Sequence, residues 1–128
     1  MTSFSINKPF ELQEQRRDDL TILFAAGPLE RIELAALETA LKRLAREDRR
    51  RVIVDFSEVT TLSTLVVAGF IICAESFRSN GGEMTVTGVS RSLRDAFLMI
   101  DSYGKVHQQT DVVTAIKAMS PQSAEKEG

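Results

Sequence analysis

The sequence predicts a single α/β domain in which a mixed sheet of four to five strands, parallel at its centre, packs against about four helices. Three observations predict this class. The 128-residue chain is long enough to enclose one core. It opens with two apolar segments around a polar turn, which is the pattern of a β-hairpin. Strand-like and helix-like segments then alternate, and this alternation implies right-handed crossovers between parallel strands.

The two strands of the hairpin open the chain. Residues 10–14 alternate apolar and polar side chains, as expected of a strand with one solvated face. Residues 16–19 (Arg-Arg-Asp-Asp) form a polar turn, and residues 20–26 form a mostly apolar second strand. We expect Gly27 and Pro28 to end that strand.

Two helices and a buried strand follow the hairpin. Leucines at three- and four-residue steps predict an amphipathic helix with Glu30 and Glu33 in its first turns, and the mostly apolar residues 52–56 indicate a buried strand. A second helix begins at or near Thr64 and runs to about Ser79, where Asn80-Gly-Gly is typical of a glycine C-cap. This helix is apolar all round, so its second face is either buried or presented to a partner.

The last third of the chain repeats the alternation on a smaller scale. Residues 84–88 indicate another strand, and Ser90 is a suitable N-cap for a third helix. Residues 105–108 indicate a short edge strand. Thr110 or Asp111 then caps a final helix.

Composition and charge indicate a soluble, cytoplasmic protein made of one domain, residues 1–119, with a flexible polar tail over residues 120–128. A net charge of −2 argues against a dedicated nucleic-acid binder. Cys73 is the single cysteine, and its apolar surroundings are typical of a small core residue in a reducing compartment. No secretory signal is visible, and the longest apolar run, residues 65–74, is far shorter than the roughly 20 residues that span a bilayer. We therefore expect no direct membrane insertion.

Motifs for catalysis and for metal or cofactor binding are missing from the sequence. His107 is the only histidine, so no set of histidines and cysteines has metal-ligand spacing. No Gly-x-Ser-x-Gly elbow accompanies it, as a serine hydrolase would require. No Walker A or Gly-x-Gly-x-x-Gly loop is present. We predict that the protein is not an enzyme, has no catalytic residue, and uses no metal or cofactor.

Hydroxyl side chains gather between the buried strand and the apolar helix. In sheets with parallel central strands, functional sites form at the carboxyl ends of the strands. A helix N-terminus carries unpaired N–H groups and a partial positive charge, which stabilise a phosphate group. A hydroxyl there can act as a switch, or it can simply cap the helix, as Ser63 or Thr64 would. The hydroxyl residues are Ser57, Thr60, Thr61, Ser63 and Thr64.

This strand, turn and helix resemble the STAS domain family, known from anti-sigma factor antagonists. The family pattern is a hydrophobic strand, Asp-Leu-Ser-Gly-Val-Thr, two hydrophobic residues, Asp-Ser-Ser-Gly-Leu, and then a helix. The resemblance continues through Gly81-Gly82 and the strand after it, and Gly27-Pro-Leu-Glu falls where the family often has Gly-Glu-Leu-Asp. It covers about residues 8–119. The matching positions are Asp55, Phe56, Ser57, Val59, Thr60, Leu62 and Thr64.

The resemblance implies a protein-interaction module that regulates transcription by partner switching. Such a module binds an anti-sigma factor serine/threonine kinase, which is a histidine-kinase-like ATPase, and phosphorylation of a hydroxyl at the helix start breaks that binding. Thr64 falls on this hydroxyl, and Ser63 is the less favoured acceptor. Asp55 is expected to shape the site or, from the residues alone, to accept hydrogen bonds from nearby backbone N–H groups. The expected partner-binding residues are Glu30, Arg31, Ser57, Glu58, Thr61, Ser63, Thr64, Leu65 and Val66.

Two features depart from the family pattern. Ser63 replaces the family's aspartate, which removes a carboxylate beside the acceptor, and Leu65 and Val66 replace residues that are often small. We hypothesise that Leu65 and Val66 form an exposed apolar patch beside Thr64 that packs on a partner. A phosphate in such an interface would be expelled, because its desolvation is costly.

Three other functions remain compatible with the sequence. The first is a STAS subunit of a membrane transport assembly that binds an ABC-type ATPase constitutively. The second is a small nucleotide-binding or hydrolytic protein, against which the missing phosphate loop argues. The third is a structural module that assembles with itself through the apolar second helix. In the leading interpretation we expect a monomer or a weak dimer.

Overall fold

The computed structural model describes residues 9–100 and 106–119. Within these ranges it contains one sheet of strand order β1-β2-β3-β4-β5, in which β1 is antiparallel to β2 and the other neighbouring pairs are parallel. The predicted mixed sheet with parallel central strands and about four helices is confirmed. None of the helices in these ranges is long and apolar enough to cross a membrane. The elements are β1 (Glu11–Arg17), β2 (Leu20–Leu29), α1 (Arg31–Arg46), β3 (Arg51–Leu62), α2 (Thr64–Ser79), β4 (Glu83–Thr87), α3 (Arg91–Ile100), β5 (His107–Gln109) and α4 (Val112–Met119).

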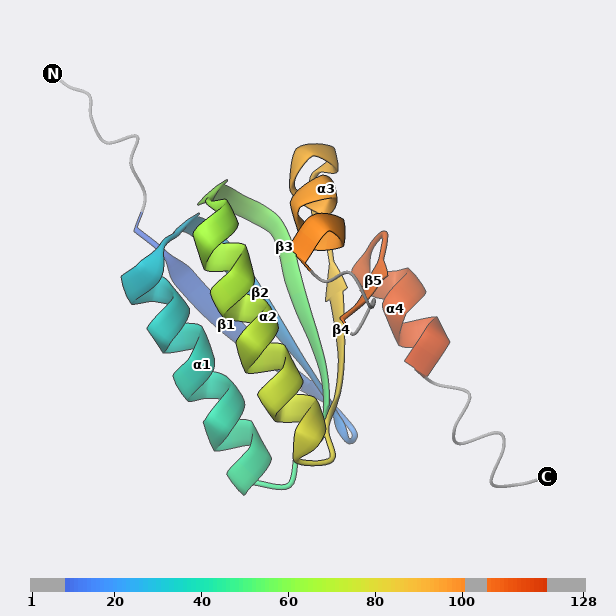
Figure 1. The fold of residues 1–128 in the computed structure, drawn as a ribbon. Coiled ribbons are helices and arrows are strands. Elements are labelled where there is room, and N and C mark those ends of the chain that lie inside the picture. The colour runs from blue at the N-terminus through green and yellow to red at the C-terminus, as the bar shows by residue number, and fades with distance from the viewer. Residues whose placement is uncertain (1–8, 101–105, 120–128) are drawn as a thin grey trace, which may run out of the picture.

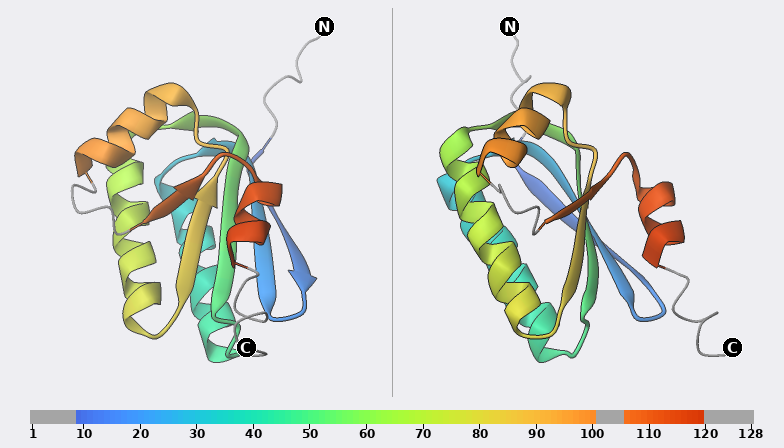
Figure 2. Two further views of the ribbon diagram at one scale, coloured as in Figure 1. Left: turned by 90° about the vertical axis from the view of Figure 1, so that its right-hand side faces the viewer. Right: turned by 45° about the vertical axis from the view of Figure 1, so that its right-hand side comes forward.

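The helices cover both faces of the sheet. α1 and α2 run side by side along one face, α3 lies across the end of the sheet near the start of α2, and α4 covers the opposite face (Figures 1 and 2). Successive side chains of a strand point to opposite faces. Val52 and Val54 therefore enter the larger core under α1 and α2, whereas Ile53 enters the smaller core under α4.

Three phenylalanines connect the larger core to α3. Phe56 comes from β3, Phe70 from α2 and Phe97 from α3, and all three are buried. The ring centroids of Phe56 and Phe70 lie 5.2 Å apart, and those of Phe70 and Phe97 lie 6.2 Å apart, both in edge-on arrangements. These contacts hold α3 against the first half of α2.

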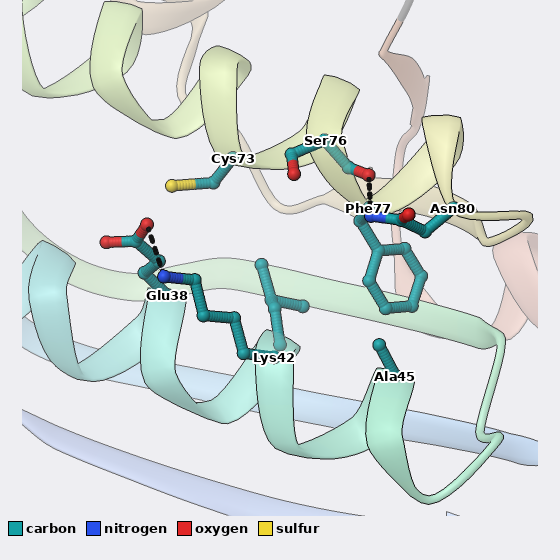
Figure 3. Close-up of a pocket in the computed structure, with 8 residues that line it drawn as sticks. Glu38, Lys42, Ala45, Cys73, Ser76, Phe77 and Asn80 are labelled. Atoms are coloured by element: carbon teal, nitrogen blue, oxygen red, sulfur yellow. Dashed lines mark hydrogen bonds and ion pairs between the residues drawn. The ribbon is translucent and has the colours of Figure 1, made fainter.

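α1 and α2 approach each other closely where Leu34 meets Gly69. A Cβ atom added to Gly69 would lie 2.7 Å from Cδ2 of Leu34, so the missing side chain allows the close approach. Towards the ends of the two helices, residues of both line a cavity of about 50 Å³. Cys73 lies half-buried on its wall, and the ion pair of Lys42 with Glu38, 3.4 Å long, lies beside it (Figure 3). The prediction of a core cysteine is thus only partly met, and burial raises the pKa of its thiol.

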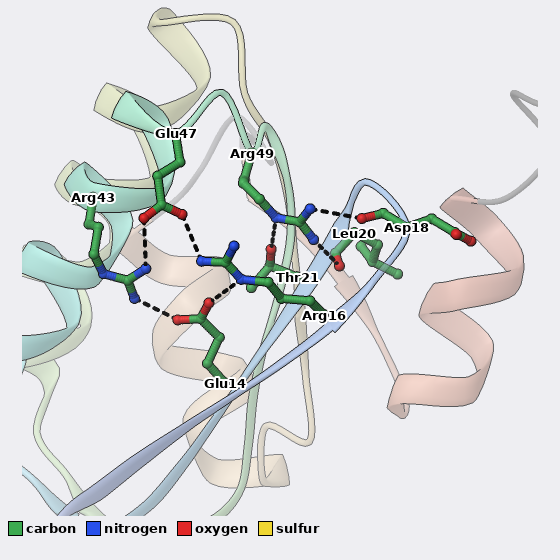
Figure 4. A network of polar contacts seen from close by, with 8 residues as sticks. All are labelled: Glu14, Arg16, Asp18, Leu20, Thr21, Arg43, Glu47 and Arg49. Atoms are coloured by element: carbon green, nitrogen blue, oxygen red, sulfur yellow. Dashed lines mark hydrogen bonds and ion pairs between the residues drawn. The ribbon is translucent and has the colours of Figure 1, made fainter.

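Arg49 ties the end of α1 to the hairpin (Figure 4). Its guanidinium donates to Oγ1 of Thr21 at 2.9 Å and to the carbonyl oxygens of Leu20 and Asp18, both at 2.8 Å. Asp18 has a positive φ of 56°, which turns the chain sharply between β1 and β2. The Arg49 side chain therefore fixes both the hairpin turn and the entry into β3.

Several predicted boundaries were wrong. Gly27 and Pro28 do not end β2, which stays paired to Leu29, and β3 continues beyond residue 56 to Leu62. The predicted edge strand at residues 105–108 is β5, His107–Gln109, and residue 105 lies outside the described residues. The tail at residues 120–128 also lies outside them, and the domain boundary stays a prediction.

The predicted ends of the helices agree better with the structure. Asn80 is the C-cap of α2, and Gly81 follows it with φ of +91°, a backbone conformation that suits glycine. The hydroxyl of Ser90 accepts from the Leu93 N–H at 3.4 Å, although this distance is long. Asp111, rather than the residue before it, caps α4 by accepting from the N–H of Thr114 at 2.8 Å.

Alternating charges fasten the exposed edge strand β1 to the end of α1 (Figure 4). Glu14 on β1 accepts from Arg43 on α1 at 2.5 Å and from Arg16 at 2.6 Å. Arg16 also donates to Glu47 at 2.7 Å. The hydrogen bond from Arg43 is the main cause that lowers the pKa of Glu14, and the pair with Arg16 adds to it.

We predict that Glu14→Gln destabilises the protein modestly at neutral pH, by less than about 1 kcal/mol because solvent screens these pairs. The folded-state pKa of Glu14 lies below its ordinary value of 4.5, so the stabilisation is present above that value and is lost as the pH falls through the lowered one. Urea unfolding at pH 7 and pH 3 tests this. Glu11→Gln on the same strand is the control, and an equal loss at both pH values in Glu14→Gln would contradict the assignment.

Candidate functional site

The candidate site begins where β3 separates from β4. The two strands pair in parallel from Arg51–Glu83 to Asp55–Thr87 and no further. Beyond this point β3 stays paired with β2 alone, through two register shifts, until Leu29 lies beside Leu62. The segment that was predicted to be a polar turn is therefore an extension of β3. One edge of the extension is left without a strand partner among the described residues.

Asp55 stands at the point of separation and is 5% exposed. Its Oδ1 accepts from the hydroxyl of Thr87 at 2.7 Å, and its Oδ2 accepts from the hydroxyl of Ser57 at 2.5 Å and, more weakly, from the Ser57 N–H at 3.3 Å. These donors make the buried carboxylate tolerable. Asp55 was expected either to shape the site or to accept hydrogen bonds from backbone N–H groups. Both roles are compatible with this geometry, because Asp55 accepts from the Ser57 N–H and also holds the hydroxyls of Ser57 and Thr87.

Gly88 makes this arrangement possible. It has φ of +71°, and a Cβ atom there would lie 2.6 Å from the Ser57 nitrogen and 2.9 Å from Oδ1 of Asp55. Any larger residue would push the β3 extension away from the end of β4. A glycine is therefore required for the close approach of the two chain segments.

The start of α2 separates the roles of the two candidate hydroxyls. Ser63 is the N-cap, with an extended backbone, and its Oγ accepts from the N–H of Val66 at 3.2 Å. Thr64 is the first residue of the helix, and its side chain is exposed. The expectation that a hydroxyl merely caps the helix is thus met by Ser63, and the hydroxyl of Thr64 is available to a partner.

The starts of α1 and α2 lie next to each other because of the strand register. The pair Leu29–Leu62 ends the β2–β3 ladder, and each helix begins after one intervening residue. A groove of about 520 Å³ opens between the two helix starts. It is lined by Glu30, Arg31, Leu34, Thr61, Ser63, Leu65, Val66 and Gly69.

Most of the predicted partner-binding residues meet at this groove, but one belongs to the core. Leu65 is 69% exposed, whereas Val66 is 7% exposed and packs in the larger core. The hypothesis of a patch built from both side chains is therefore wrong for Val66. Adjacent helix residues point about 100° apart, so the two could not share the exposed face equally. Ser57 and Glu58, on the β3 extension, and Thr64, at the start of α2, are exposed and do not line the groove.

Sequence reasoning missed three contributors to this surface. Leu34 and Gly69 form part of the groove wall, and Ile32 is 81% exposed at the start of α1. The helical spacing identified Leu34 only as a core residue, and Gly69 only as part of an apolar run. Ile32 does not lie on the helix face formed by the leucines of α1. This position in the sequence pattern could have identified Ile32 as an exposed apolar residue.

Other candidate chemistries find no support in the described part of the chain. It holds no cluster of three or more potential metal-ligating side chains. His107 is exposed on the edge strand β5, as expected for an ordinary surface residue. The site consists of hydroxyls, one buried carboxylate and a groove with apolar and charged side chains in its wall.

Comparison with family models matches residues 11–115 to the STAS domain. The chain belongs to the STAS domain family. The match spans the hairpin, the β3 extension, both helices that border the groove and the first half of α4. A search of curated proteins found no match.

Solved structures share the fold at low sequence identity. A serine-to-glutamate variant of RsbS from Moorella thermoacetica has a TM-score of 0.74 at 11% identity, over 88% of this chain and 97% of that one. An anti-sigma factor antagonist from Mycobacterium paratuberculosis has a TM-score of 0.72 at 15% identity, over 88% and 95%. The unphosphorylated form of SpoIIAA, an anti-sigma factor antagonist, has a TM-score of 0.67 at 11% identity, over 88% of this chain and 98% of that one. The phosphorylated form of SpoIIAA from Bacillus also matches. These similarities establish the fold of this STAS domain.

The cap geometry predicts different effects for the two neighbouring hydroxyls. Ser63→Ala should destabilise the domain by about 1 kcal/mol, because the Val66 N–H loses its acceptor. Thr64→Ala should change the free energy of unfolding by less than about 0.5 kcal/mol, because it alters an exposed side chain at a helix end. Chemical denaturation of both variants measures this. Equal destabilisation would show that Thr64 also has a structural task.

Proposed function

We propose that this STAS domain is an anti-sigma factor antagonist-like interaction module in the cytoplasm. It binds a kinase-type anti-sigma factor, a histidine-kinase-like ATPase, and it is switched by phosphorylation of Thr64. The observation that carries the proposal is the strand register, which places the exposed Thr64 between Ser63 and Leu65, two residues that line the groove. The SpoIIAA structures in unphosphorylated and phosphorylated form support it, because they show that a protein of this fold is a phosphoprotein.

The unphosphorylated surface suits a protein partner. Leu65 lines the groove and Ile32 lies in the first turn of α1; both are large, apolar and exposed, and burying such side chains stabilises a complex. Glu30 and Arg31 add charges on the α1 side of the groove, which give orientation and specificity. The exposed Ser57 and Glu58 extend the proposed interface along β3.

Phosphorylation would act on this surface without unfolding the domain. The partner kinase transfers the γ-phosphoryl group of its bound ATP to the Thr64 hydroxyl: the bond to the β-phosphate oxygen breaks, the bond to Oγ1 forms, ADP leaves, and the hydroxyl proton passes to a base of the kinase. The product carries about −1.5 to −2 charges at neutral pH. A helix start tolerates this charge, but an apolar interface does not.

Affinity capture from native cell extract tests the switch. We predict that the wild-type domain retains a histidine-kinase-like ATPase and that Thr64→Glu loses it, because glutamate places a negative charge in the interface. Thr64→Gln is the matched control, since it has the size of glutamate at the same position without the charge. Retention of a transport ATPase by both wild type and Thr64→Glu would overturn the proposal in favour of a constitutive transport subunit.

The apolar side of the site gives a second prediction. Leu65→Asp should leave the fold intact, because this side chain is 69% exposed, and should weaken binding of the captured kinase at least about tenfold. Val113→Asp is the control: its side chain is 62% exposed on α4, which covers the opposite face of the sheet. Titration calorimetry with the purified kinase measures both affinities. Equal affinities of the two variants would place the interface elsewhere.

A further inference from the structure

We propose that Arg31 is the counter-ion of the phosphate on Thr64, and that this pair closes the groove between α1 and α2 in the phosphorylated state. The inference rests on the proposed function, because it assumes that Thr64 is the phosphorylated residue. It adds a regulatory contact within the chain itself. The phosphate would then act in two ways: it would engage Arg31, so that this residue no longer contacts the partner, and it would repel the partner.

The register of the sheet makes Arg31 and Thr64 equivalent positions in neighbouring strand–helix units. Leu29 of β2 pairs with Leu62 of β3, one capping residue follows each, and Arg31 and Thr64 are the first residues of their helices. Paired strands lie about 4.8 Å apart and packed helices about 8–10 Å apart. A flexible arginine side chain spans that separation, so its guanidinium can reach a phosphate on the neighbouring helix start.

Several arginines among the described residues are held by contacts that Arg31 lacks. Arg16 and Arg43 bind carboxylates, and Arg49 and Arg50 bind backbone carbonyls. Within the described residues, Arg31 makes no ion pair or side-chain hydrogen bond, although it is exposed and lines the groove. Its guanidinium is therefore available without breaking an existing contact. Phosphate matches its planar fork, because two N–H groups can donate to two phosphate oxygens.

The acidic groups near the groove cannot serve as counter-ions of a phosphate. Glu30 is the acidic residue that lines the groove, and it would repel the phosphate. The carboxylate of Glu33 faces the same turn and accepts from the Glu30 N–H at 3.1 Å. No acidic residue lies in the first turn of α2. Among the residues that the structure describes, Arg31 is the only cationic side chain that lines the groove.

Phosphorus NMR of the domain with phosphothreonine incorporated at position 64 tests the pair without any partner. A free phosphothreonine titrates with a second pKa of about 6. Pairing with Arg31 lowers this pKa, and we expect Arg31→Gln to raise it by roughly 0.5 units or more, whereas Arg31→Lys should retain much of the lowering. Arg46→Gln is the control, because it removes the same charge from the opposite end of α1.

The outcomes separate this inference from the proposed function. An unchanged phosphate pKa in Arg31→Gln, or a change equal to that in Arg46→Gln, would overturn the pair even if Thr64→Glu still loses the kinase. A shift specific to Arg31 would establish the pair even if the captured partner is not a kinase. Glu30→Gln should shift the phosphate pKa in the opposite direction to Arg31→Gln, which checks that the groove charges act directly.

Discussion

The parallel pairing of β2 with β3 is the interaction on which both the fold and the candidate site depend. It runs from Leu20–Arg51 to Leu29–Leu62, and β3 is the longest strand among the described residues. Because one residue separates each strand from its helix, the end of this ladder determines where α1 and α2 begin. A slip of one residue would turn the core side chains to the wrong face. It would also move the two helix starts out of alignment, so selection for a stable core also preserves the groove.

A second constraint directs β3 away from β4. Asp55 links the last paired residue of β4, Thr87, to Ser57 at the start of the extension, through bonds of 2.7 and 2.5 Å. Gly88 then leaves room for the extension to pass. Removing one of the two hydroxyl donors would leave the buried charge of Asp55 partly unsatisfied, which costs free energy. The site therefore lies on a rigid part of the sheet, although its hydroxyl residues are exposed.

The sequence predicted the class of fold because apolar periodicity reports burial, and burial determines how strands and helices pack. It failed at residues 57–62, where a polar composition indicated a turn. This segment pairs on one edge only and is largely solvated, so its strand conformation comes from β2 and not from its own side chains. The burial of Val66 and the existence of the groove were also beyond sequence reasoning. The groove needs Leu34 and Gly69, which come from different helices and meet only through tertiary packing.

The serine at position 63 shows how a departure from the family pattern changes charge while keeping geometry. A serine oxygen can cap a helix as an aspartate oxygen does, and Ser63 makes this bond to Val66. The start of α2 is therefore preserved without a carboxylate, and its partial positive charge is not neutralised by an acidic residue in the first turn. In the proposed switch, a phosphate on Thr64 would meet less local repulsion than it would beside an aspartate. The folded domain would then accept the modification at lower cost, and the change in surface charge would act mainly on the partner.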